Sequence, residues 1–191
     1  MSSPVADTRV ERYYYIFDSR QQRAVVVDRT TGAEYDWEGE ARVQLIRHVA
    51  AVAGPATLVR FAAWCSAQTG AGSRGAGGGE GPADRLAEAA RKRADGGAAV
   101  SERAAAVRDE TNDDVLMAST VGLPRQEPEA ARLLTAQAAL IDDPVEAAIN
   151  AAHMSERWAE FSAEDSPESA ARAMRERQID WLLDRLLDAG A

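Results

Sequence analysis

The sequence predicts an α+β fold, in which a small N-terminal antiparallel β-meander covered by helices precedes an alanine-rich, all-α helical bundle. Three observations support this prediction. Aromatic and β-branched residues concentrate in residues 12–37, which hold all four tyrosines of the 191-residue chain. A glycine-rich segment, residues 70–82, lacks the side chains that build a core. Most of the remaining sequence consists of alanine, arginine, leucine and acidic residues at helical spacings.

These features divide the chain into four segments. Residues 1–10 are expected to form a flexible arm, and residues 11–69 the meander with two helices. Residues 70–82 are expected to be a linker and residues 83–191 the helical bundle. The sequence leaves open whether the second and fourth segments pack as one domain.

In the meander, strands are expected at residues 13–17, at residues 24–27 and around Tyr35. The first alternates side chains between two faces, and the second is a β-branched run typical of a covered strand. Gly32 can adopt the left-handed conformation that a short hairpin loop requires. Because three strands alone are marginally stable in water, the two helices that follow are expected to cover them.

Amphipathic periodicity predicts the helices. They are expected at residues 38–53, 56–68, 83–94, 101–110, 128–141, 145–161 and 166–190. Gly54 and Pro55 are expected to separate the first two of these helices, and Pro167 to lie in the first turn of the last one. The helix at 145–161 carries apolar residues on two sides and should therefore lie between two neighbours. Trp158 and Trp181 lie on or beside apolar stripes and are expected to be core residues.

Composition narrows the class of protein. The net charge of −9 and the pI of about 4.8 disfavour binding to nucleic acid or to an anionic membrane and suit a basic partner. Cys65 is the single cysteine, so an intramolecular disulfide is excluded. The sequence shows no apolar leader and no long uncharged apolar run, so we expect no membrane segment and a cytoplasmic location.

Nucleotide-binding patterns occur without the structural context that they need. Residues 70–75 match GxGxxG, but an expected helix precedes them and further glycines follow, which is the arrangement of a linker. Residues 24–28 resemble the strand that ends in a magnesium-binding aspartate, yet the chain contains no GxxxxGK[ST] loop. No cofactor is therefore predicted.

Metal and catalytic patterns are equally incomplete. Residues 109–114 are acidic but lack the glycine and the distal acid of a calcium loop. His153 and Glu156 form an HxxE pair on one helix only, so a solvated polar stripe with ion pairs to Arg157 is favoured over a di-metal site. Cys65 lies on an apolar stripe and is interpreted as a buried structural thiol, not as a nucleophile paired with His48.

Arginines are concentrated in residues 84–108. Acidic residues are interleaved with them and no aromatic residue accompanies them, so a solvated helix face is favoured over a nucleic-acid contact.

The segment 64–68 (WCSAQ), the long alanine-rich helical tract and the closing segment 176–183 (ERQIDWLL) carry a family resemblance. Over residues 56–188 the chain resembles a loose group of uncharacterised alanine-rich helical bacterial proteins, some of them labelled as immunity proteins. The resemblance implies no catalytic residues.

These observations predict a non-enzymatic protein that binds another protein, as an immunity-type or assembly factor does. The expected partner is basic, and self-association is left open. Predicted helix ends and loops carry the acidic residues of the expected partner surface, which are Asp142, Asp143, Glu146, Glu160, Glu164 and Asp165. A structural component of a phage or bacterial assembly and an enzyme with a dispersed active site are the alternatives.

Overall fold

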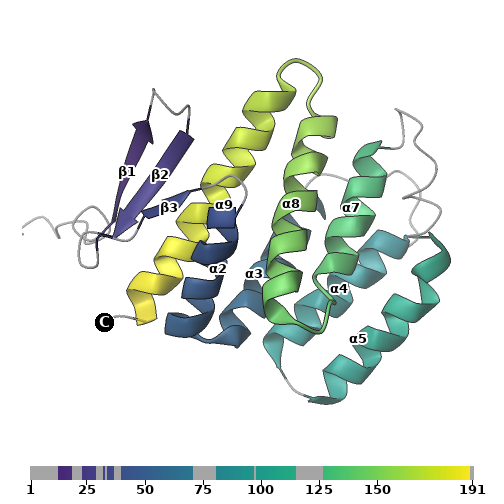
Figure 1. Cartoon of the computed structure of the whole chain (residues 1–191). Coiled ribbons are helices and arrows are strands. Elements are labelled where there is room, and N and C mark those ends of the chain that lie inside the picture. Colours follow the sequence, from purple (N-terminus) through teal and green to yellow (C-terminus); the bar gives the residue numbers. More distant parts are fainter. Residues whose placement is uncertain are drawn as a thin grey trace, which may run out of the picture.

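A computed structural model describes residues 13–18, 23–28, 32, 34–36, 40–70, 81–96, 98–114 and 127–189 (Figure 1). Its helices are α2 (Glu40–Ala53), α3 (Pro55–Gly70), α4 (Pro82–Asp95), α5 (Ala98–Glu110), α7 (Glu127–Ala138), α8 (Pro144–Ser162) and α9 (Pro167–Ala189). The strands are β1 (Tyr13–Asp18), β2 (Arg23–Asp28) and β3 (Glu34–Asp36), which pair antiparallel in the order β1-β2-β3. The expected arm at residues 1–10 and most of the expected linker lie outside the described residues.

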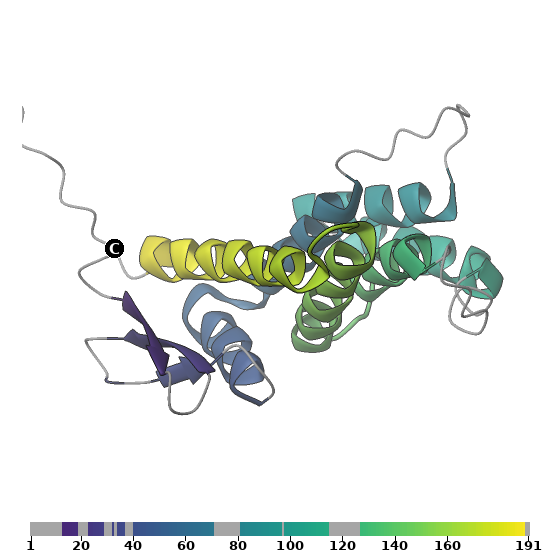
Figure 2. The ribbon, with the colours of Figure 1, turned by 90° about the horizontal axis from the view of Figure 1, so that it is seen from above.

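The predicted α+β class is wrong, because the fold is all-α. One hydrophobic cluster runs through the molecule from Leu45 of α2 to Leu186 of α9, and no described strand residue belongs to it. The short strands lie at one end of the helical body, beside α2 and far from α5 (Figures 1 and 2). The N-terminal segment therefore does not define the fold.

The fold class differs from the prediction because α2 and α3 pack mainly against other helices. Both helices were expected to cover the meander. Helix α2 does contact β3, but it also packs against α3, α8 and α9, and α3 packs against α8 and α4. Alanine-rich faces let helix axes approach closely, and such faces bury their apolar stripes well against one another. Helices from both sides of the glycine-rich segment thus share a single core.

Local sequence signals set several helix ends. Gly54, with φ of +85°, separates α2 from α3, and Pro55 occupies the first turn of α3. Asp143 caps α8, because its carboxylate accepts hydrogen bonds from the backbone N–H groups of Val145 (2.8 Å) and Glu146 (2.9 Å). Pro167 begins α9, as the sequence predicts.

Helix α8 occupies the centre of the bundle. It packs against α3, α7 and α9 (Figure 1), which confirms the prediction from its two apolar sides. Its buried positions are mostly alanines, including Ala147, Ala148, Ala151 and Ala152.

Polar contacts fix the register between α8 and α9. Arg175 of α9 donates to the carboxylate of Glu156 at 2.9 Å, and the Gln178 amide donates to Ala152 O and Ser155 Oγ, both at 3.0 Å. Glu156 is 4% exposed. The predicted solvated stripe is therefore wrong for Glu156, because the side chain faces α9; it is right for His153, which is exposed.

Two arginines hold the C-terminal end of α7. Arg93 of α4 donates to the carbonyl oxygens of Ala139 (3.2 Å), Ile141 (2.6 Å) and Asp142 (3.1 Å). Arg108 of α5 donates to Leu140 O at 3.4 Å. Carbonyls at a helix C-terminus lack intrahelical partners and carry partial negative charge, so guanidinium groups stabilise them.

Among the helices that the structure describes, none combines the length and the apolar character that a membrane span requires.

Candidate functional site

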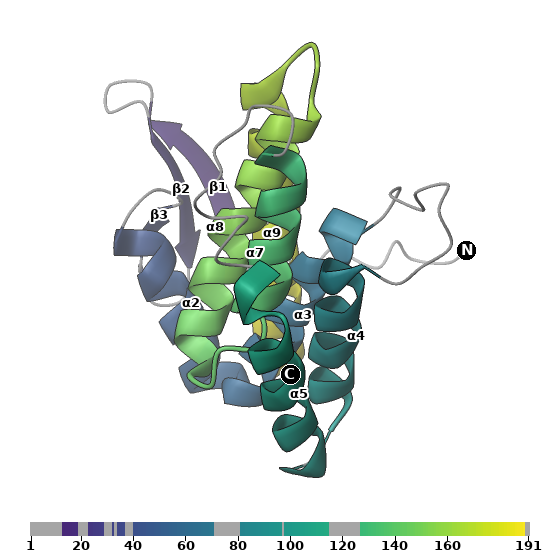
Figure 3. The same cartoon turned by 90° about the vertical axis from the view of Figure 1, so that its right-hand side faces the viewer.

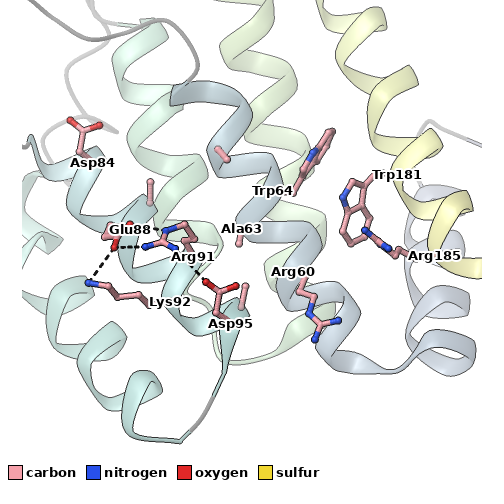
Figure 4. Close-up of a pocket in the computed structure, with 13 residues that line it drawn as sticks. Arg60, Ala63, Trp64, Asp84, Glu88, Arg91, Lys92, Asp95, Trp181 and Arg185 are labelled. Atoms are coloured by element: carbon pink, nitrogen blue, oxygen red, sulfur yellow. Dashed lines mark hydrogen bonds and ion pairs between the residues drawn. The ribbon is translucent and has the colours of Figure 1, made fainter. Parts of the chain in front are cut away.

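A groove of about 700 Å³ lies across α3, between α4 and α9 (Figure 4). Figure 3 shows α3 and α4 side by side. All of its described lining residues belong to these three helices. They are Arg60, Ala63, Trp64, Ala67, Asp84, Ala87, Glu88, Arg91, Lys92, Ala94, Asp95, Trp181 and Arg185.

Helix α3 forms the floor of the groove because its two faces differ. Arg60, Ala63, Trp64 and Ala67 recur at i, i+3, i+4 and i+7 and share the face that lines the groove. The opposite face is buried in the core, and it contains Leu58, Phe61, Ala62 and Cys65. The structure thereby confirms Cys65 as a buried thiol.

Aromatic rings form one side of the groove. The Trp64 and Trp181 ring centroids are 6.2 Å apart, and each ring contacts the fully buried Phe61, with centroid distances of 6.1 Å and 5.3 Å respectively. Both tryptophans are half-buried. Packing against the core holds the rings in fixed orientations, while part of each faces the groove.

Trp181 therefore differs from its prediction as a purely core residue. One part packs against the core, and another part lines the groove. Trp158, the other tryptophan predicted to be a core residue, is also half-buried.

Charged side chains of α4 form the other side of the groove (Figure 4). Arg91 donates two hydrogen bonds to Glu88, at 2.9 Å and 2.7 Å, and lies 3.4 Å from the Asp95 carboxylate. Lys92 lies 3.2 Å from Glu88. The hydrogen bond from Arg91, with support from Lys92, lowers the pKa of Glu88 to about 2. Glu88 is therefore charged at neutral pH and already paired.

The two arginines beside the tryptophans, Arg60 and Arg185, lack strong ion pairs within the described residues. Arg60 is exposed, and no carboxylate of the described residues forms an ion pair with it. The Arg185 guanidinium lies 5.1 Å from the centroid of the Trp181 ring and pairs with Asp188 at 3.0 Å. Both members of that pair are largely exposed, so the pair is weak and easily exchanged.

The chemistry of the groove is that of a binding surface. Its described lining contains no serine, threonine, cysteine or histidine. In the described part of the chain, no three His, Cys, Asp or Glu side chains gather in a way that could hold a metal ion. The groove presents two indole rings, several alanines and several guanidinium groups.

The acidic residues predicted as the partner surface do not form one surface. Asp142, Asp143 and Glu146 lie at the start of α8, whereas Glu160 is near its end and Glu164 and Asp165 follow it. The nearest members of the two groups on α8, Glu146 and Glu160, are 14 residues apart, which is about 21 Å along the helix at 1.5 Å per residue.

Two of these acidic side chains also have local structural partners. Asp143 caps α8, and Glu160 pairs with Arg157 at 3.0 Å. Asp142 and Glu146 are exposed beside the cap, and Glu164 and Asp165 are exposed in the connection to α9. Two separate acidic clusters thus replace the single expected surface.

The groove was not predicted from the sequence. The i, i+3, i+4, i+7 pattern of Arg60, Ala63, Trp64 and Ala67 was a usable signal, because it places a large aromatic ring between small side chains on a polar face. The arginine-rich segment was interpreted as a solvated face. That interpretation holds for Arg91 and Lys92, which are exposed, and is wrong for Arg93, which is half-buried against α7.

Comparison of the chain with models of protein families, with curated proteins and with solved structures finds no match.

Proposed function

We propose that this protein is a non-enzymatic protein-binding factor, and that the groove between α3, α4 and α9 receives a segment of its partner. The observation that carries the proposal is the pair of half-buried tryptophans, Trp64 and Trp181, held open to solvent beside Arg60 and Arg185. Tryptophan and arginine are the residue types most enriched at the energetic centres of protein interfaces.

Rigidity supports the same proposal. Trp64 and Trp181 contact Phe61, which is fully buried, so partner binding would not require the two indole rings to be ordered first. Side chains that are already ordered lose little conformational entropy on association. Preorganised aromatic rings are therefore an efficient binding surface.

Net charge acts at longer range than the groove. The charge of −9 favours the approach of a partner that is basic overall, and the acidic residues at the α7–α8 connection contribute to that attraction. Contact chemistry is set by the groove, where aromatic, small and cationic side chains meet on one face.

Photocrosslinking from the groove tests the proposal. A photoreactive amino acid at Ala67, which is exposed in the groove, should crosslink one protein in a lysate of the cells that carry the gene. The same residue at Ala106, which is exposed on α5 away from the groove, should not crosslink that protein.

The captured protein is then purified and its affinity measured. Ala67→Arg should weaken binding at least about tenfold by filling the groove, whereas Ala106→Arg should leave the affinity within about twofold. Arginine is a good helix former, so both variants should fold. Equal crosslinking at the two positions, or equal affinities of the two arginine variants, would contradict a binding role for the groove.

A further inference from the structure

We infer that the segment bound in the groove is an amphipathic helix with an apolar stripe and acidic flanks; this inference rests on the proposed protein-binding function. Three features of the groove favour this occupant. They are its helical walls, the position of its aromatic rings, and the difference between its carboxylates, which already have basic partners, and two of its arginines, which have no strong ion pair.

The helical walls of the groove favour a helix as the bound segment. Every described lining residue belongs to a helix, in which backbone N–H and C=O groups are bonded within the helix itself. Such walls offer no strand edge to an extended peptide, whose own backbone groups would lose water without gaining partners. A helix satisfies its backbone internally and brings only side chains to the contact.

The alanines that line the groove fit the approach of a helix. Ala63 and Ala67 are one turn apart on α3, and Ala87 and Ala94 are two turns apart on α4. Small side chains in rows on both helices leave room for the ridge of a third helix between them. The occupant would therefore lie along the groove and present a stripe at i, i+3, i+4 and i+7.

The aromatic rings decide what that stripe contains. Trp64 and Trp181 project from α3 and α9 on the side of the groove opposite the charged wall of α4 (Figure 4). Leucine, phenylalanine or methionine side chains would cover the exposed parts of both rings. Burial of such side chains is the main favourable term in helix-in-groove recognition.

The ion pairs of the groove's charged side chains indicate that the flanks of the bound helix are acidic. The acidic lining residues already have basic partners: Glu88 and Asp95 contact Arg91, and Asp84 pairs with Arg132 of α7. Arg60 has no described ion pair, and Arg185 has only an exposed one. An acidic helix would pair with Arg60 without breaking a described ion pair, and with Arg185 in exchange only for its weak, exposed pair with Asp188. A basic helix would meet two guanidinium groups of its own sign.

A pair of synthetic helical peptides tests the inference. Both carry the same leucine stripe at i, i+3, i+4, i+7 and i+11 in an alanine background, and their flanks are either all glutamate or all lysine. Fluorescence anisotropy with the full-length protein at about 150 mM salt measures binding, because screening there limits the influence of distant charges. The glutamate peptide should bind at least about tenfold more tightly than the lysine peptide.

Two double variants locate the effect. Arg60→Glu with Arg185→Glu reverses the two uncommitted groove cations and should weaken the glutamate peptide at least about tenfold. Arg47→Glu with Arg172→Glu reverses two exposed arginines on α2 and α9 outside the groove lining and changes the net charge equally. This control should alter the affinity less than about twofold. Circular dichroism checks that both double variants are folded.

The outcomes separate the inference from the function on which it rests. Equal binding of the two peptides, equal effects of the two double variants, or no binding of the glutamate peptide below about 1 mM would overturn the acidic helix. If Ala67 still crosslinks a protein in that case, the protein-binding function stands. Both proposals fail if three results occur together: neither peptide binds, the photoreactive residue at position 67 crosslinks no protein, and native mass spectrometry finds a bound small molecule that Ala67→Arg excludes.

Discussion

The contact between Arg93 and the end of α7 supports a quantitative prediction. Arg93→Ala removes three hydrogen bonds from a guanidinium to backbone carbonyls, of which those to Ala139 and Ile141 are partly buried and that to Asp142 is exposed. Water can replace the exposed bond but not fully the other two. Hydrogen bonds to a charged group contribute about 1.5–3 kcal/mol each, so the two partly buried bonds set an upper range of about 3–6 kcal/mol.

Burial of the guanidinium offsets part of that gain. Desolvation lowers the pKa of Arg93 despite the attraction of Asp142, which indicates that the charged form loses hydration on folding. We therefore expect Arg93→Ala to cost about 2–4 kcal/mol in the free energy of unfolding. Arg93→Lys keeps the charge but replaces the planar group that spans three carbonyls, and should cost about half as much.

Urea denaturation measures these changes as a shift in the midpoint at constant slope. Arg91→Ala is the matched control, because Arg91 lies two residues away on the same helix and makes only exposed ion pairs, which contribute little to stability. A loss below about 1 kcal/mol for Arg93→Ala, or equal losses for the two variants, would refute the role assigned to the contact.

Three further predictions concern other charged groups. Glu156→Ala removes the buried partner of Arg175 and should cost about 1–3 kcal/mol by thermal unfolding, whereas Arg157→Ala, at an exposed pair, should change Tm little. The pKa of Glu88 is lowered from 4.5 to about 2, so its ion pairs stabilise the fold above pH 4.5 and this contribution is lost as the pH falls toward 2. The stability difference between wild type and Glu88→Gln should follow that curve, and a difference that persisted below pH 2 would contradict the assignment. The acidic cluster at the start of α8 can be neutralised by substitutions that keep the α8 cap, and these should slow association with a basic partner without lowering Tm. Association rates are measured between about 50 and 500 mM salt, and an on-rate unaffected by salt or by substitution would contradict electrostatic attraction. These substitutions are Asp142→Asn, Asp143→Asn and Glu146→Gln.

The sequence alone determined features whose causes lie within a few residues. Gly54 and Pro55 predicted the break between α2 and α3, and Pro167 predicted the start of α9. The two apolar sides of residues 145–161 predicted a helix between neighbours, and the apolar stripe around Cys65 predicted its burial. Glycine conformation, proline geometry and helical periodicity are local properties, so no knowledge of the fold was needed.

Only the tertiary structure decided which faces meet. An alanine-rich stripe shows that a helix buries one side but not which partner covers it, because many alanine faces fit one another equally well. For this reason α2 and α3 were assigned to the strands, although they pack in the helical core, and the fold class was predicted wrongly.

The same physical reason applies to the polar contacts and to the groove. Arg93 reaches carbonyls that lie 46 to 49 residues away in the chain, and nothing local to the arginine indicates that contact. The two groups of acidic residues were placed on one surface by composition, and the length of α8 separates them. Trp64 and Trp181 were visible in the sequence, but their meeting beside Arg60 and Arg185 depends on how α3, α4 and α9 pack, which only the three-dimensional arrangement sets.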